Sequence, residues 1–441
     1  MFSNKTLFKL ILPLIFEQLL AMSVGIVDTA MVSSLGEAAV SGVSLVDMIN
    51  QLMISIFAAL ATGGAVVTAQ YIGHKENKKA CQSASQLMLI AVCISIFIMG
   101  LCLLLHRPIL KLVFGTIDAT VMNNAVIYLV ISALSYPFLA LYNCGASLFR
   151  AMGNSKISLQ VSILMNIVNV IFNSIFIFAM HMGVAGAAYG SLISRAVAAI
   201  VIVLMLRSHK NIVHFIKFQW PFFQKDMGKK ILYIGVPNGL ENGMFQLGRI
   251  LVVSIISTFG TTQIAANAVA NNLDALGIIP GSALGLAMIT VIGQCVGAGD
   301  YEQVEYYTKK ILKATYITMA AVVGVILLTL PYILQIYSLS DETLNLSMTL
   351  VRIHNGCAIF FWPMAFVLPN ALRASNDVRF TMYVTTLSMC LFRILFSLIL
   401  GRWLGLGAIG VWIAMVLDWI FRASLFAYRF LSKKWQKIKL I

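Results

Sequence analysis

Two carboxylates interrupt the first long apolar stretch of the chain, around residues 8–33. Glu17 and Asp28 are eleven residues apart, so on an α-helix they share one face and lie roughly 16 Å apart along the axis. An ionisable group at bilayer depth costs about 2.5–3.5 kcal/mol, so it faces a cavity or a partner. We therefore take Asp28, deep in the stretch, as a candidate site for H⁺ or Na⁺, with a structural, hydrogen-bonded carboxylate as the alternative. Glu17, nearer the end, is a secondary candidate.

A polar stripe runs along a second apolar stretch, around residues 158–180. Asn166, Asn169 and Asn173 stand at positions i, i+3 and i+7, which places them on one helix face. Asparagine carbonyls can bind a cation, and the amides can hydrogen-bond a carboxylate. Hydrogen bonding between helices, which is common in membrane bundles, is the alternative. Ser191 and Tyr189, in the next stretch, are secondary candidates to complete the network.

Ionisable residues also lie in the apolar stretches of the C-terminal half. Glu241 follows Pro237 in the segment GVPNGLENG and is a candidate to bind an ion or a cationic substrate. A carboxylate at the start of a helix, near the interface, is the alternative. Six further charged residues of this half could pair structurally with one another: Arg249, Asp274, Arg352, Arg393, Asp418 and Arg422.

The composition places these residues in a membrane protein. Of the 441 residues, 60% are hydrophobic and 11% are charged, against about 25% charged residues in soluble proteins. Stretches of roughly 20 apolar residues can span a bilayer, and we count twelve. The predicted spans are 8–33, 42–70, 83–105, 120–146, 158–180, 184–207, 230–258, 264–295, 308–330, 344–370, 380–400 and 406–431. We expect no cleaved signal peptide, because the first span lacks a small-residue cleavage site.

The distribution of basic residues predicts the orientation of these spans. With the N-terminus inside, the cytoplasmic segments hold 23 Lys and Arg and the external segments hold three, so both termini are expected in the cytoplasm. The net charge of +15 is thus an orientation signal, and no nucleic-acid partner is expected. The seven cysteines form no CxxC or CxxH pattern, so we predict no disulfide or metal framework.

The two halves of the chain are related by an internal repeat. A shift of 224 residues aligns residues 13–76 with the second half without a gap. The matched pairs are Pro13 and Pro237, Glu17 and Glu241, Gly36 and Gly260, Gln70 and Gln294, Gly73 and Gly297, and Gly183 and Gly407. The segment FRAMGNSK at 149–156 matches LRASNDVR at 372–379 with a shift of 223. Six spans per half is an even number, so the halves enter the membrane from the same side.

The repeat predicts an all-α membrane protein of two homologous six-helix bundles around a central cleft, a plan that recurs in transporters. We place the N-terminal lobe at 1–207, a basic cytoplasmic linker at 208–229 and the C-terminal lobe at 230–441. Helix breakers inside the spans are expected to form hinges or cavity walls, because freed backbone groups must face protein or water. They are Pro137, Pro280, Pro363, Pro369, the pair Gly63–Gly64, and Gly281.

These features resemble the multidrug and toxic compound extrusion family over essentially the whole chain. The resemblance is carried by VDTAMVSSLG at 27–36, GGAVVTAQYIG at 63–73, the FRAMGNSK turn and the NIVNVIFN stripe. It implies alternating access and export driven by an H⁺ or Na⁺ gradient. The family's N-lobe aspartate falls on Asp28, its fifth-helix pair on Asn169 and Asn173, and the C-lobe glutamate of one branch on Glu241. Two departures leave the coupling ion open: the tenth span has no aspartate in FFWPMAF, and Asn173 stands where another branch has aspartate.

We therefore predict a secondary transporter of the inner, or plasma, membrane that exports small cationic or amphipathic compounds. A lipid-linked oligosaccharide flippase of the same superfamily is the first alternative, disfavoured by twelve spans and acidic N-lobe residues. An integral membrane enzyme is the second, disfavoured because the chain holds no HExxH motif and no Gly-rich phosphate loop. We expect a monomer whose partners are its small-molecule substrates and membrane lipid, with no cofactor besides the coupling ion.

Overall fold

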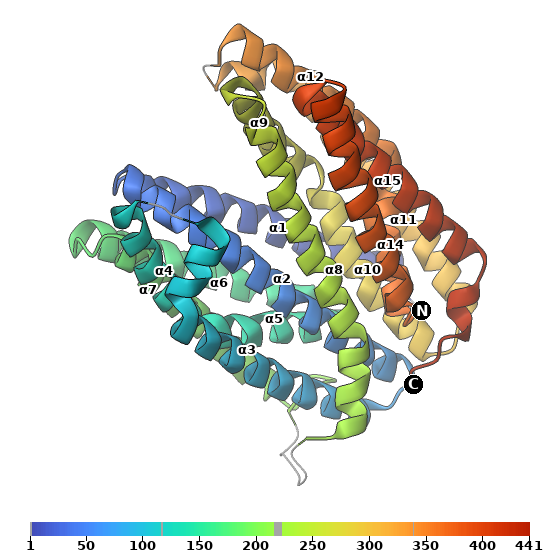
Figure 1. Ribbon diagram of the computed structural model, residues 1–441. Helices are drawn as coiled ribbons and strands as arrows, with labels where there is room; N and C mark the ends of the chain where they lie inside the picture. Colours follow the sequence, from blue (N-terminus) through green and yellow to red (C-terminus); the bar gives the residue numbers. More distant parts are fainter. Residues whose placement is uncertain (1, 116–117, 216–222, 338) are drawn as a thin grey trace. The chain divides into compact units, whose positions relative to one another are not determined.

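All regular secondary structure in the described part of the protein is helical. The computed structural model describes the whole chain apart from residues 1, 116–117, 216–222 and 338, and no strand occurs in the described part. Contacts divide it into two compact units, which we call the N-terminal unit (Phe2–Gly239) and the C-terminal unit (Leu240–Ile441). The all-α class and the two-part organisation predicted from the sequence are confirmed (Figure 1).

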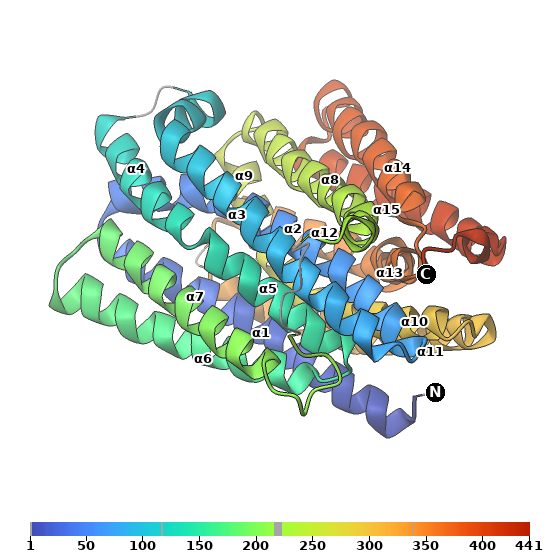
Figure 2. The same ribbon diagram turned by 90° about the horizontal axis from the view of Figure 1, so that it is seen from below.

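The N-terminal unit is a bundle of long helices. Its elements are α1 (Asn4–Ser33), α2 (Glu37–Gly73), α3 (Asn77–Phe114), α4 (Ala119–Leu134), α5 (Tyr136–Ala151), α6 (Ser155–Ser174) with the π-helix η1 (Ile175–Ala179), α7 (Val184–Leu206) and the start of α8 (Lys225–Ser257). Helix α2 packs on α3 and α5, α6 packs on α7, and α1 packs on α6 (Figure 2). This packing brings α1, α2, α6 and α7 together, which are the helices that carry the predicted N-terminal site residues and their neighbours.

The C-terminal unit repeats this plan. Its elements after α8 are α9 (Thr261–Gly277), α10 (Ile279–Gly297), α11 (Tyr301–Gln335), α12 (Asp341–Trp362), η2 (Pro363–Val367), α13 (Leu368–Ala374), α14 (Val378–Ser388), η3 (Met389–Leu395), η4 (Ser397–Trp403), α15 (Gly407–Leu431) and η5 (Lys434–Lys437). Helix α12 packs on α9 and α15, and α10 packs on α11 and α13. A core of buried Leu, Ile, Val and Trp side chains fills the space between α9, α11, α12 and α15.

The helices match the predicted spans one for one when broken helices are joined. Among the described residues, ten helices are long and apolar enough to cross a membrane, or eleven if the bent pair α4 and α5 is one span. Helix α8 is not among them, because Glu241 and Arg249 dilute its apolar stretch. The chain is therefore a multi-pass membrane protein, and the cleft expected between its two bundles stays a prediction.

Most predicted breakers do interrupt helices. The α4–α5 pair bends by 48° just before Pro137, α10 begins one residue before Pro280, and η2 begins at Pro363. Gly63–Gly64 form no hinge, because α2 runs through both glycines without a break. Their role is close packing instead: a Cβ on Gly63 would lie 2.7 Å from the Ile231 carbonyl oxygen of α8.

This close approach explains where the two units divide. The first turns of α8 pack against α2, Lys230 Nζ donates to the Tyr71 hydroxyl at 2.8 Å, and Asn238 Nδ2 lies 3.5 Å from the Ala59 carbonyl oxygen. The division by contacts consequently falls at residues 239/240, inside α8, and the predicted lobe bounds at 207 and 230 stay a prediction. Residues 216–222 of the predicted linker, Lys217 among them, lie outside the described residues.

The internal repeat is visible in the backbone. Gly36 and Gly260, which the repeat aligns, precede α2 and α9 with φ of 97° and 103°. Gly183 and Gly407 precede α7 and start α15 with φ of 61° and 59°. Positive φ is a conformation that glycine adopts at little cost. The glycines that the repeat matches therefore mark equivalent turns in the two units.

Candidate functional site

The strongest candidate site is a cavity in the N-terminal unit. It has a volume of about 300 Å³ and is lined by residues of α1, α2, α4, α6 and α7. Two acidic side chains, Asp28 and Asp47, line it together with one basic side chain, Arg195. Ionisable groups at this depth of a membrane bundle are expensive unless they serve a site. The cavity therefore has the polarity of a cation site.

Asp28 is held by the asparagine stripe, as its spacing predicts. Asn173 Nδ2 donates to Asp28 Oδ1 at 2.9 Å and lies 3.2 Å from Asn169 Oδ1. Asn169 Nδ2 lies 3.3 Å from Ser191 Oγ on α7. The structure thus joins Asp28, Asn169, Asn173 and Ser191 into one network, with Asp28, Asn173 and Ser191 on the cavity wall.

Two local features fix the position of Asn173. Helix α7 passes so close to it that a Cβ on Gly190 would lie 1.9 Å from Asn173 Oδ1. The π-helix η1 begins two residues after Asn173, and such insertions are frequent at functional sites. Asn173 Oδ1 is buried and accepts no hydrogen bond. A carboxylate oxygen of Asp28 and this carbonyl oxygen could both bind a hard cation such as Na⁺.

Two charged residues of this cavity, Asp47 and Arg195, were not among the residues predicted from the sequence. On α2, Asp47 Oδ1 accepts a hydrogen bond from Asn50 Nδ2 at 3.3 Å. The Tyr136 hydroxyl donates to Asn50 Oδ1 at 3.0 Å. Arg195 on α7 donates to Ser135 Oγ at 2.7 Å. Both are ionisable residues within predicted spans, which is the same signal that identified Asp28. They add one negative and one positive charge to the predicted site.

Two residues near the network stay outside it. Tyr189, a secondary candidate, is 37% exposed, and no hydrogen bond joins it to the network in the described part of the chain. Asn166 is buried, and its Nδ2 has no hydrogen-bond partner there. In the described residues, no group of three or more His, Cys, Asp or Glu side chains is arranged to bind a metal ion.

Glu17, the other acidic residue of α1, forms a buried ion pair. Arg150 Nη1, at the end of α5, lies 3.2 Å from Glu17 Oε1, and Ser158 Oγ donates to Glu17 Oε2 at 2.8 Å. Glu17 is 8% exposed. The pair ties α1 to the α5–α6 turn, so Glu17 has a structural partner, while the role in ion coupling suggested for it stays a prediction.

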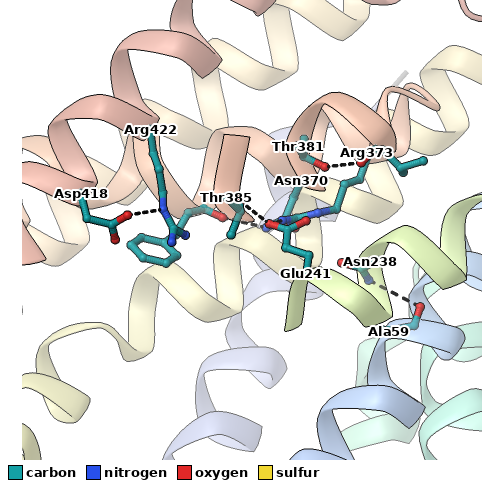
Figure 3. Close-up of polar contacts among 11 residues, drawn as sticks. Ala59, Asn238, Glu241, Asn370, Arg373, Thr381, Thr385, Asp418 and Arg422 are labelled. Carbon is teal, nitrogen blue, oxygen red and sulfur yellow. Dashed lines mark hydrogen bonds and ion pairs between the residues drawn. The ribbon is translucent and has the colours of Figure 1, made fainter. Parts of the chain in front are cut away.

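Glu241 stands in the equivalent environment in the C-terminal unit. Arg373 Nη2 donates to Glu241 Oε1 at 2.6 Å and Thr385 Oγ1 donates to the same oxygen at 2.7 Å (Figure 3). Arg373 Nη1 also donates to Asn370 Oδ1 at 2.6 Å. The repeat aligns Glu17 with Glu241 and Arg150 with Arg373, so the two ion pairs are equivalent. A role for Glu241 in binding an ion or substrate stays a prediction.

Some of the remaining charges of the C-terminal unit do pair with one another. Arg422 Nε donates to Asp418 Oδ1 at 2.9 Å, and Arg393 Nε lies 3.8 Å from Asp418 Oδ2 (Figure 3 shows the Arg422 contact). Asp274 pairs instead with His354, whose Nδ1 lies 2.8 Å from Asp274 Oδ1. Within the described residues Arg249 and Arg352 have no ion pair.

Comparison with known protein families identifies the repeat independently. The model of the MatE family matches twice, to residues 13–175 and to residues 237–399. The two matches have equal length and are offset by 224 residues, which is the shift found within the sequence. Together they cover more than half of the chain.

Individual relatives and solved structures match this chain over almost its whole length. The probable multidrug resistance protein NorM of Thermotoga maritima is 26% identical over 98% of this chain and 93% of its own. The uncharacterized transporter YisQ of Bacillus subtilis is 25% identical over 98% of this chain and 94% of its own. An outward-facing multidrug resistance MATE transporter of the MOP superfamily matches with a TM-score of 0.90 at 20% identity, over 99% of this chain and 97% of that chain. A MOP superfamily transporter from Pyrococcus furiosus, for which a reverse polarity of the binding pocket is described, gives the same values.

Proposed function

Because this chain belongs to the MatE family of multidrug and toxic compound extrusion transporters, we propose that it exports small cationic or amphipathic organic compounds in exchange for H⁺ or Na⁺. Its multi-pass helical fold and its multidrug-resistance relatives support a drug efflux transporter. The exchange of ions for substrate, and the alternating access that it requires, are the proposal.

The observation that carries the proposal is the Asp28 carboxylate in the N-terminal cavity. It accepts a hydrogen bond from Asn173 and shares the cavity with Asp47. Among the described residues of the cavity wall, Arg195 is the one basic side chain. Such a group can take up a cation facing one compartment and release it facing the other. The ion drives transport only if it binds the two states with different affinities. Asn173 supports both ions, because its amide stabilises ionised Asp28 and its free carbonyl oxygen can bind Na⁺.

We propose the following cycle. Binding of H⁺ or Na⁺ at Asp28 neutralises the carboxylate, which favours the state that releases the substrate outside. Release of the ion to the cytoplasm restores the charge, which favours the state that binds the next substrate. We further propose that the chain is a monomer of the plasma membrane with both termini in the cytoplasm, as its basic residues predict.

A dye-efflux assay with separate control of the two gradients tests the coupling. Cells that lack their own efflux pumps and express this chain are loaded with ethidium, and the efflux rate is followed by fluorescence. In one arm nigericin in a potassium buffer collapses the pH gradient, and in the other choline replaces external Na⁺. We expect one arm to stop efflux and the other to leave it running, which identifies the ion. Efflux that survives both arms would contradict cation coupling.

A further inference from the structure

A second cavity lies wholly within the C-terminal unit and differs in charge from the first. It has a volume of about 270 Å³, and its walls include Arg249, Arg393, Asp274 and His354 together with large aromatic side chains. None of these residues takes part in the ion site around Asp28. Buried charges in a membrane bundle require a partner or a ligand, so the pairing of this cavity's charges decides what it can bind.

Arg393 has an ion-pair partner but no hydrogen bond from its guanidinium group in the described residues. Its side chain is buried, with 5% of the residue exposed, and its Nε makes no hydrogen bond. Its ion pair is with Asp418 Oδ2 at 3.8 Å, too far for a hydrogen bond. Asp418 Oδ1 accepts from Arg422 Nε at 2.9 Å and from Ser388 Oγ, while Asp418 Oδ2 is buried and accepts no hydrogen bond. The guanidinium fork of Arg393 therefore keeps unused donors, which suit a carboxylate.

The other charges of the cavity do not compensate. Arg249 is an exposed residue of the cavity wall and has neither a hydrogen bond nor an ion pair in the described residues. Asp274, the acidic residue on the wall, is engaged by His354 Nδ1 at 2.8 Å. Among the described residues of the wall, Arg249 and Arg393 stand against one acidic side chain, Asp274. The wall therefore has an excess of one arginine over its aspartate, which a ligand with a single negative charge balances.

The walls of the cavity define the rest of that ligand. The rings of Trp362 and Phe366 are stacked, with centroids 5.0 Å apart and an angle of 23°. The Arg393 guanidinium lies 5.0 Å from the ring centroid of Phe245, so a flat aromatic surface adjoins the positive charge. Aromatic side chains bind flat rings by stacking, and apolar walls with a few placed polar groups are typical of ligand sites.

We propose that this cavity binds aromatic monocarboxylates, with Arg393 and Arg249 binding the carboxylate and the aromatic walls binding the ring. The inference rests on the proposed function in one respect, since it makes such acids substrates for export. It extends the substrate class beyond cationic and amphipathic compounds. The acidic cavity around Asp28 serves the coupling ion, and the basic cavity serves the anionic group of the substrate.

A binding measurement tests the site without any gradient. The full-length protein is purified in nanodiscs of zwitterionic lipid and titrated with 7-methoxycoumarin-3-carboxylate or with its uncharged carboxamide. Energy transfer from tryptophan to the coumarin reports binding, because Trp362 and Trp419 line the cavity. We expect the acid to bind at least tenfold more tightly than the amide. Equal affinities in the wild-type protein would overturn the proposal.

Matched variants assign the preference to the cavity. Arg393→Gln should abolish the preference for the acid, and it leaves Asp418 paired with Arg422, so the fold should survive. Arg249→Gln gives an independent second test. Arg402→Gln, the same change at an exposed site in the same unit, should keep the preference. A preference unchanged in both Arg393→Gln and Arg249→Gln would overturn the site.

Transport separates this proposal from the proposed function. Proteoliposomes are loaded with the coumarin acid, and its release is followed with and without an ion gradient. If the protein binds the acid more tightly than the amide but does not release the acid under an ion gradient, export of the acid is contradicted and the binding site is supported. Gradient-driven release of ethidium in a protein that binds acid and amide equally would support export and overturn the site.

Discussion

Replacing Gly190 with alanine should disable the ion site without touching any charged residue. The added Cβ would lie 1.9 Å from Asn173 Oδ1 and 3.0 Å from the Asn173 backbone nitrogen. Since the van der Waals contact distance of a carbon atom is about 3.5 Å, the Asn173 amide must move by more than about 1 Å. Its hydrogen bond to Asp28, now 2.9 Å, would then stretch to about 4 Å, beyond hydrogen-bonding range.

The size of the effect follows from the bond that is lost. A hydrogen bond to a charged group contributes about 1.5–3 kcal/mol, and each 1.4 kcal/mol is about tenfold in affinity. If ionised Asp28 depends on this bond, efflux at a limiting gradient should fall roughly tenfold or more. The assay is the initial rate of ethidium efflux at matched amounts of protein in the membrane.

Two controls make the Gly190→Ala result specific. Gly100→Ala adds the same methyl group inside α3, where nothing lies within 4 Å, and should leave efflux unchanged. The double variant Gly190→Ala with Asn173→Ala should be no worse than Asn173→Ala alone, because both changes act on one hydrogen bond. Wild-type efflux by Gly190→Ala would refute the view that Asn173 must sit where the structure places it.

Asn169, Glu241 and the orientation of the chain offer three further tests. Asn169→Ala should lower the rate of efflux less than Asn173→Ala does, because it leaves the bond from Asn173 to Asp28 in place; equal losses in the two variants would count against that order. Glu241→Gln leaves the largely buried Arg373 without its carboxylate and should lower the free energy of unfolding by roughly 3 kcal/mol, measured as thermal unfolding in detergent; an unchanged melting temperature would show that the pair is not stabilising. A cysteine at position 437 should react with an impermeant maleimide only in inside-out vesicles and one at position 341 only in whole cells, and the opposite pattern would reverse the orientation.

Much of the fold could be predicted from the sequence because lipid imposes a strict requirement. Every span needs a long apolar segment with its backbone bonds satisfied internally, so hydropathy located the helices and the repeat located the two units. The division between the units at residues 239/240, inside α8, has no hydropathy signal, because it depends on packing between helices. The contact of Gly63 with Ile231 leaves no periodic signal, and the Gly63–Gly64 pair alone predicts a break in the helix instead.

The candidate site was predictable where the residues share a helix face. The spacing of Asn169 and Asn173 placed them together, and the structure brings Asn173 to Asp28. Tyr189 and Ser191 are two residues apart, about 200° around a helix, so they cannot both face one network. The Ser191 side chain is the one that joins it.

The ion pairs required the tertiary structure. The repeat aligns Glu17 with Glu241, and the FRAMGNSK match aligns Arg150 with Arg373. Sequence alone did not reveal that each glutamate meets the arginine of its own unit, because the two residues are more than 130 positions apart. Their equivalence in the two units favours a structural role for this pair in both.

The central claim is that the Asp28 carboxylate couples ion entry to substrate export. Its most direct test is gradient-driven ethidium transport in proteoliposomes, comparing wild type with Asp28→Asn at equal reconstitution, and with Asp341→Asn, an exposed aspartate, as the matched control. We predict that Asp28→Asn abolishes the gradient-driven component, while ethidium binding is reduced less than transport and Asp341→Asn behaves as wild type. Wild-type transport by Asp28→Asn would contradict the claim and leave Asp28 as a packing residue.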